Sequence, residues 1–213
     1  IIINSLKQQI DNFKKNNRWK LLLNSLNENF QKLWYLKNHK GKYSKLIEVV
    51  SDPATLVAAY QVLKLKFNNI IATASDKTLD YLDNKWFLDI AQKIKTEKFK
   101  FKIAQRISIS KPNNFKIQLL TKDNFKDRIV QQAIHMVLKQ IFESEFLSTS
   151  YGFRTFKSCQ SAFVQIRKNW VGISWFLKFN IQKCFDKIDK HRLISILREK
   201  IDDQRFLDCA LKK

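Results

Sequence analysis

The stretch from Arg128 to Ile141, RIVQQAIHMVLKQI, carries the clearest structural signal in the sequence. Its apolar residues recur three and four positions apart, which is the spacing of one face of an α-helix. Polar side chains such as Gln131 and His135 occupy the positions between them. The stretch therefore predicts an amphipathic helix that buries one face. The positions expected to be buried are Val130, Ala133, Ile134, Val137, Leu138 and Ile141.

Helical spacing also dominates the residues that precede this stretch. Two amphipathic helices are expected near the start of the chain, around 6–13 and 22–33. Asp52 followed by Pro53 predicts the N-cap and the first residue of another helix. Its buried face would hold Leu56, Tyr60 and Leu63. A further helix fits the spacing of Phe87, Ile90, Ala91 and Ile94.

The period of the pattern changes from helical to alternating near residue 98. Three lysines alternate here with three apolar residues, so the segment predicts a strand with one basic and one apolar face. Residues 111–114, Lys-Pro-Asn-Asn, are typical of a turn, and 116–120 can form the returning strand. A basic β-hairpin is therefore expected. The alternating residues are Lys98, Phe99, Lys100, Phe101, Lys102 and Ile103, continued by Ile107 and Ile109.

Three more elements are expected towards the C-terminus. A bend at 151–154 precedes a helix marked by Phe163, Ile166 and Trp170. Alternation over 175–181 predicts a strand, and a last helix fits Leu193 to Ile201. The five tryptophans are expected to pack into apolar faces more than to stack on bases. They are Trp19, Trp34, Trp86, Trp170 and Trp175.

The net charge points to a polyanionic partner. Forty Lys and Arg residues stand against nineteen Asp and Glu, which gives +21 over 213 residues. Such self-repulsion destabilises a compact fold unless a polyanion offsets it, and structured nucleic acid is the first candidate. No apolar run approaches the roughly 18 to 20 residues of a membrane helix, so no membrane association is expected.

Neither a metal nor a cofactor is expected. The three cysteines, Cys159, Cys184 and Cys209, form no C-x-x-C pair, and the three histidines lie apart from them, so zinc-like spacing is absent. Lys, Ile, Asn and Phe are abundant, and all four have A/T-rich codons, which hints at an organelle genome.

Four short sequence motifs follow one another along the chain: Ser110 to Asn113, Lys126 to Gln131, Ser150 to Arg154 and Cys184 to Asp189. Together they resemble the fingers and early palm of a group II intron reverse transcriptase, or maturase, of the mitochondrial type. The resemblance implies an α+β fold and a mitochondrial, organelle-encoded protein. It divides the chain into a basic helical region (1–74), a fingers-like region with the basic hairpin (75–170) and an incomplete palm (171–213).

One departure from the family decides the expected chemistry. The family's first palm strand presents an aspartate that binds two catalytic Mg²⁺ ions, whereas this chain has Asn180 there. A neutral amide does not offset the repulsion of two hard cations. Asp186 and Asp189 lie past the strand end, where Asp189 is expected to cap the next helix. The chain is therefore expected not to be an enzyme.

Two further departures agree with lost catalysis. Ile117 stands where the family has an arginine that reaches the nucleotide phosphates, and an aliphatic side chain forms no such pair. The family's Tyr-Ala-Asp-Asp turn does not occur in the sequence. Phe185, at the family's 2′-hydroxyl gate, is then expected to be a core residue. The unfinished palm sheet is expected to be covered by another protein or an RNA.

These observations predict a non-catalytic RNA-binding remnant of an organellar maturase, acting as a structural or splicing-assistance subunit of a ribonucleoprotein. Ribosomal RNA of the mitochondrion and intron RNA both remain possible ligands. One alternative is half of a split, active reverse transcriptase, and another is a basic scaffold for acidic proteins. The candidate RNA-binding residues are Lys98, Lys100, Lys102, Arg106, Lys111, Lys126, Arg128, Arg154, Lys157, Arg167 and Lys168.

Overall fold

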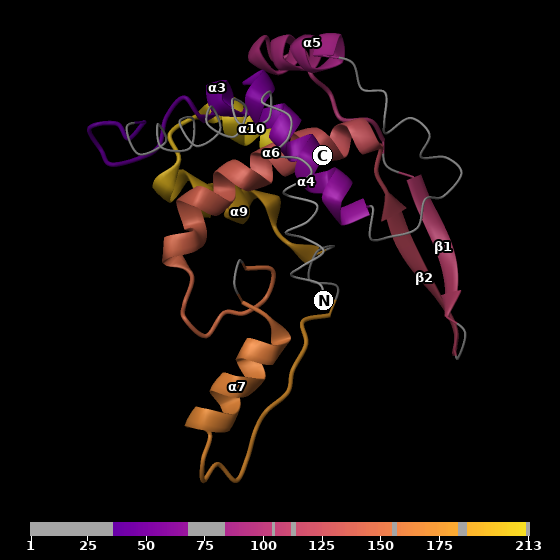
Figure 1. The fold of residues 1–213 in the computed structure, drawn as a ribbon, viewed down its shortest axis with the longest axis vertical. Coiled ribbons are helices and arrows are strands. Elements are labelled where there is room, and N and C mark those ends of the chain that lie inside the picture. Colours follow the sequence, from indigo (N-terminus) through magenta and orange to yellow (C-terminus); the bar gives the residue numbers. More distant parts are fainter. Residues whose placement is uncertain are drawn as a thin grey trace, which may run out of the picture.

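A computed structural model describes residues 36–67, 84–103, 105–111, 114–154, 157–182 and 187–211. This part of the chain contains seven α-helices, a short 3₁₀ helix and one two-stranded sheet (Figure 1). The helices expected at 6–13 and 22–33 lie outside the described residues. None of the described helices is long and apolar enough to cross a bilayer.

Helix α6 (Phe125–Phe142) provides the largest buried face of the core. Helices α3 (Leu46–Val50) and α4 (Pro53–Phe67) pack on it, and α5 (Asn84–Lys95) packs on both of them. The periodic stripe predicted for α6 is confirmed: five of its six positions are buried and Leu138 is partly buried. Phe206 and Leu207 of α10 (Gln204–Leu211) join the same cluster. The core is therefore helical and combines distant parts of the sequence.

The start of α4 follows the predicted capping pattern. Pro53 is the first helical residue, and Asp52 Oδ1 accepts a hydrogen bond from the Ala54 N–H at 2.9 Å. A carboxylate there satisfies a backbone donor that has no partner within the helix. The expected stripe of α4, from Leu56 to Leu63, is buried, as is the expected stripe of α5. Both helices are confirmed.

The predicted hairpin exists, but it begins later than expected. Strands β1 (Gln105–Lys111) and β2 (Asn114–Lys122) pair antiparallel, with Ile109 opposite Gln118 and an irregularity after Ser110. Residues 98–103 precede the hairpin without strand structure. Phe99 and Phe101 instead pack on the helical core, edge to face with 4.9 Å between their ring centroids. Burial of these two rings therefore overrides the alternating pattern before β1.

The expected α+β class with a truncated palm is wrong. Helices dominate the described residues, and residues 171–182 form no strand. Leu177 and Phe179, predicted to lie in the first palm strand, are 93% and 87% exposed. An alternating pattern makes a strand possible, but the backbone N–H and C=O groups need a neighbouring strand to pair with. The described residues supply no such neighbour for this segment.

The helices predicted around Phe163 and from Leu193 to Ile201 are present, whereas α10, which follows them, was not predicted. Helix α7 (Cys159–Asn169) starts with a capping box formed by Ser158 and Ser161. It projects away from the helical core (Figure 1), and its expected apolar face is exposed, with Phe163 at 69%. Helix α9 (Lys190–Lys200) leads back to the core through the buried Ile201. The division at 74 and 170 stays a prediction, although the core cluster contains residues of all three ranges.

Candidate nucleic-acid interface

A row of three exposed lysines lies on the segment between α5 and β1. Lys98, Lys100 and Lys102 point away from the core because the residues between them, Phe99 and Phe101, pack inward. The described part of the chain offers these three ammonium groups neither a carboxylate nor a hydrogen-bond acceptor. The segment thus displays three solvated cations within five residues.

A buried carboxylate fixes this lysine segment to the core. Asp127, in the first turn of α6, is 6% exposed and accepts a hydrogen bond from the backbone N–H of Lys102 at 2.7 Å. A charge-assisted bond of this kind is stronger than a neutral one, particularly away from water. It holds the lysines at a defined place beside the start of the hairpin.

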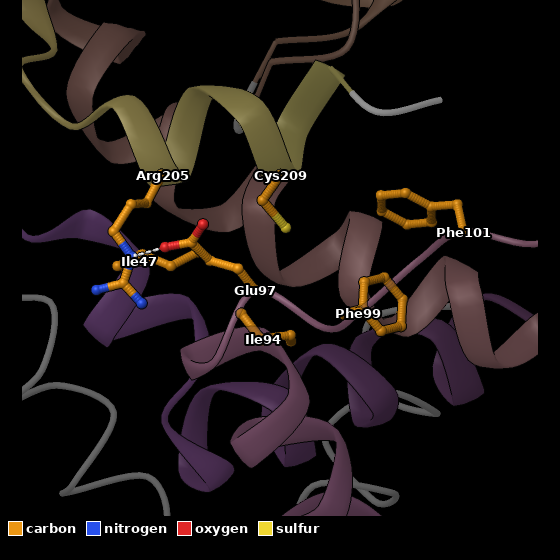
Figure 2. A pocket seen from close by; sticks show the side chains of 7 residues that line it. All are labelled: Ile47, Ile94, Glu97, Phe99, Phe101, Arg205 and Cys209. Carbon is orange, nitrogen blue, oxygen red and sulfur yellow. Dashed lines mark ion pairs between the residues drawn. The ribbon is translucent and has the colours of Figure 1, made fainter.

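Two carboxylates that precede the lysine segment in the chain are already engaged. Glu97 pairs with Arg205 across the small pocket in Figure 2, at 2.6 Å between Oε1 and Nε. Asp89 pairs with Lys93 at 2.6 Å. The pocket holds only about 10 Å³, which is room for at most one water. Glu97 and Asp89 are therefore not available to neutralise the positive charge of the lysine segment.

Four other candidate residues belong to the hairpin and to α6. Arg106 and Lys111 are in β1, and the placement of their side chains lies outside the described structure. Lys126 is exposed, and its Nζ lies 5.7 Å from the ring centroid of Trp86. Arg128 is partly buried one residue beyond Asp127. Among these four residues, Lys126 is thus the one whose charged group the structure describes and exposes to solvent.

Arg154 and Lys157, in contrast, support the loop that connects α6 to α7. Arg154 is 13% exposed at its side chain and bonds Glu143 Oε1 at 3.0 Å and the Leu147 carbonyl oxygen at 2.7 Å. Lys157 donates to the Ser148 carbonyl oxygen at 3.2 Å. Arg167 and Lys168 are exposed in the last turn of α7. The structure therefore does not gather the eleven candidates on one surface, and their role in RNA binding stays a prediction.

The degenerate catalytic position is exposed to solvent. Asn180 lies in the segment without strand structure.

The predicted role of Asp189 as a helix cap is confirmed. Asp189 Oδ1 accepts hydrogen bonds from the His191 and Arg192 N–H groups at 2.9 and 3.4 Å. Cys184, Phe185 and Asp186 lie outside the described residues. Elsewhere in the described ranges, no three His, Cys, Asp or Glu side chains gather as a metal site requires.

The tryptophans divide between core and surface. Trp86 packs on the core, as expected, whereas Trp175 is 89% exposed and Trp170 is half exposed. The packing prediction is therefore wrong for Trp175. Trp19 and Trp34 lie outside the described residues.

Sequence reasoning missed the two carboxylates that are buried among the described residues. Asp203 is 8% exposed and caps α10 by accepting from the Phe206 N–H at 3.0 Å. Its position three residues before an apolar helical residue is a recognisable capping signal. Asp127 lies inside a helix and bonds a residue 25 positions earlier, so no local pattern points to it.

Comparison with known proteins supplies the family. No protein-family model matches the chain. It is 31% identical over 175 residues to the putative COX1/OXI3 intron 1 protein of Saccharomyces cerevisiae, covering 82% of this chain and 21% of that protein. It is 29% identical over 170 residues to the group II intron-encoded protein LtrA of Lactococcus lactis, covering 80% of this chain and 28% of LtrA. The chain is a homologue of the group II intron-encoded proteins.

The predicted family resemblance is thereby confirmed. A third relative, the nuclear intron maturase 1 of Arabidopsis thaliana mitochondria, is 27% identical over 123 residues, or 58% of this chain and 17% of that protein. The relatives of this chain thus include mitochondrial and bacterial intron proteins. The chain spans about a fifth of the length of the yeast relative.

Proposed function

We propose that this chain is a non-catalytic, RNA-binding homologue of the intron maturases that acts in the mitochondrion as a structural or splicing-assistance subunit of a ribonucleoprotein. The observation that carries the proposal is the row of Lys98, Lys100 and Lys102, held outward by two buried rings and by Asp127. The net charge of +21 adds a favourable long-range field for a polyanion.

Intron RNA is the ligand that we propose over ribosomal RNA. The relatives are named as intron-encoded proteins or intron maturases, which favours an intron as the partner. Lysines on a solvated segment contact phosphates without reading base edges, so binding would select the shape of a folded RNA more than its sequence. A role in the mitochondrial ribosome would instead require the protein to co-purify with ribosomal RNA.

Loss of polymerase activity is part of the proposal. Asn180 lacks the negative charge that two Mg²⁺ ions need, and its neighbours over 171–182 do not form the strand that would hold a ligand in place. The rival is half of a split, active reverse transcriptase completed by a second chain. Asn180 argues against this rival, because a second chain does not restore the missing carboxylate.

The salt dependence of RNA affinity tests the proposal. If six to ten phosphates are neutralised, affinity for a structured intron RNA should fall by about 10³ to 10⁵ between 50 and 200 mM salt. Fluorescence anisotropy with a labelled RNA measures this slope. A nearly salt-independent affinity, or the absence of binding at 50 mM, contradicts the proposal.

Nuclease treatment of the native particle separates RNA binding from the scaffold alternative. A subunit held by RNA leaves the particle when the RNA is digested. A basic scaffold bound to acidic proteins remains associated, and that result would favour the alternative. Sequencing the protected RNA then distinguishes an intron from ribosomal RNA.

A further inference from the structure

The loop between α6 and α7 contains a strained and fully exposed aromatic residue. Phe153 has a φ of 57°, in the left-handed region, and the residue is fully exposed. A residue with a bulky side chain rarely adopts this conformation. Such a conformation persists only where the surroundings fix it, and it occurs preferentially at functional sites.

Arg154 is the residue that fixes this loop. Its guanidinium bonds the Glu143 carboxylate at 3.0 Å and the carbonyl oxygens of Leu147 and Ser150 at 2.7 and 3.1 Å. It also lies 5.3 Å from the ring centroid of Phe146. The planar fork of arginine suits several acceptors at once, and a single ammonium group does not replace it. Arg154 is therefore a positioning residue for the loop.

A second cation braces the other side of the loop. Lys157 donates to the Ser148 carbonyl oxygen at 3.2 Å, and its Nζ lies 4.7 Å from the ring centroid of Tyr151. The rings of Phe146 and Tyr151 thus each form a cation–π contact with a cation of the loop. The ring of Phe153 faces solvent. The loop therefore presents one uncovered ring, four residues before the Lys157 ammonium, whereas the charge of Arg154 is offset by Glu143.

We propose that Phe153 stacks on an unpaired base of the bound RNA. The inference rests on the proposed RNA-binding function and adds a contact that distinguishes single-stranded from paired RNA. An exposed ring close to the Lys157 cation matches the two parts of an unpaired nucleotide, because the ring stacks on the base and the ammonium group attracts the phosphate. The fixed loop lowers the entropy lost on binding.

Other exposed rings in the described chain lack this arrangement. Trp175, Phe176 and Phe179 are 89%, 75% and 87% exposed, but they lie on a segment without regular structure. No ion pair or cation–aromatic contact fixes them within the described residues. Phe153 therefore differs from these rings because the bonds of Arg154 fix the loop that carries it.

Two RNAs of matched stem sequence test the stacking. One is a hairpin with an unpaired loop, and the other is a blunt duplex. For Phe153→Leu, which keeps apolar volume but removes the ring face, we expect affinity for the hairpin to fall by about 5- to 100-fold. Affinity for the duplex should stay within about twofold. Phe153→Trp should keep the preference for the hairpin, and Phe163→Leu, on α7, is the matched control that should change neither affinity.

Phe153→Gly separates binding from stability. Glycine adopts a φ of 57° without strain, so this variant should unfold at the same temperature as the natural protein or at a higher one. It should nevertheless lose affinity for the hairpin as Phe153→Leu does. A fall in the unfolding temperature together with equal losses for both RNAs would instead assign Phe153 a structural role and overturn the proposal.

A double-variant cycle tests the positioning role of Arg154. Arg154→Lys keeps the charge but loses the fork, so it should weaken hairpin binding in the natural background. In the Phe153→Leu background, Arg154→Lys should lower hairpin affinity little further, because Arg154 acts through Phe153. Additive losses would overturn the positioning role.

The outcomes separate this inference from the proposed function. If the natural protein binds neither RNA, the proposed function fails and the stacking inference fails with it. If it binds both RNAs and Phe153→Leu binds the hairpin equally well, only the stacking inference is overturned. In a third case, Phe153→Leu binds RNA as tightly as the natural protein, but particles purified with it lack one of their other proteins. The ring would then contact a protein partner, and the stacking inference would likewise be overturned.

Discussion

Asp203 accepts a hydrogen bond from the backbone N–H of Ile47 at 2.9 Å, although the two residues are 156 positions apart. The same carboxylate caps α10 through the Phe206 N–H at 3.0 Å. One buried side chain thus joins the first helix of the described core to the last. This bond, and not a local motif, defines how the C-terminal helix closes on the rest of the molecule.

Asp203→Ala should lower the free energy of unfolding by about 2 to 4 kcal/mol. The variant removes a helix cap and also leaves a buried backbone donor without a partner. Urea denaturation followed by circular dichroism measures the change. Asp208→Ala, at an exposed position of the same helix, should cost no more than about 0.5 kcal/mol. Equal losses for the two variants would contradict the role of Asp203.

Ile129→Ala should cost about 2 to 5 kcal/mol of unfolding free energy, because Ile129 is 0% exposed on the buried face of α6. Ile103→Ala removes the same atoms from a side chain that is 97% exposed, so its cost should stay near 0.5 kcal/mol or below. The denaturation midpoints of the two variants check this difference. Similar midpoints would mean that α6 is not the centre of the core.

Thr55→Val should raise the stability by about 1 kcal/mol. The Thr55 hydroxyl is fully buried in α4 and has no hydrogen-bond partner within the described residues. Valine has nearly the same shape and removes the cost of an unsatisfied polar group. A higher urea midpoint is the expected result, and Thr55→Ala should lower it by leaving a cavity. A midpoint lowered by Thr55→Val would indicate that the hydroxyl has a partner.

Changing Lys98, Lys100 and Lys102 together to Gln should reduce the slope of log affinity against log salt by about 2 to 3. Each lysine that contacts a phosphate contributes about one unit to that slope. The matched control changes Lys93, Lys200 and Arg205 to Gln, since these three cations already pair with carboxylates. An equal fall in slope for both triple variants would show that only total charge matters.

Neither the natural chain nor Asn180→Asp should extend a primer on an RNA template in the presence of Mg²⁺. Restoring one carboxylate on a segment without strand structure does not recreate a two-metal site. Incorporation of labelled nucleotides by the purified native particle provides the readout, with an active reverse transcriptase as the positive control. Robust extension by the natural protein would contradict the non-catalytic proposal.

Where apolar periodicity coincided with burial, the sequence predicted the structure well. The stripes of α4, α5 and α6 were correct because helical hydrogen bonds are local and each stripe meets the same core. The alternating segments gave mixed results. Residues 105–122 pair as expected, because the two strands adjoin the same turn. Residues 98–103 and 175–181 do not, because a strand needs a partner that its own pattern does not specify.

The candidate interface was predicted in part. Lys98, Lys100 and Lys102 were chosen for their alternation, and they are exposed for a different reason, which is the inward packing of Phe99 and Phe101. The role of Arg154 in the loop was missed. A motif names an arginine but does not reveal whether its donors meet a ligand or the protein's own carbonyl oxygens.

The sequence by itself determined the family, the positive charge, the positions of α4, α5, α6, α7 and α9, and the caps at Asp52 and Asp189, because these depend on composition and on neighbours within a few residues. The tertiary structure alone decided which carboxylates are buried, that Asp127 anchors the lysine segment, and that Arg154 bonds the loop in which Phe153 adopts a left-handed conformation. These features depend on residues that are distant in the chain or on loop geometry, and hydrogen bonds at such separations form only once the core brings their partners together.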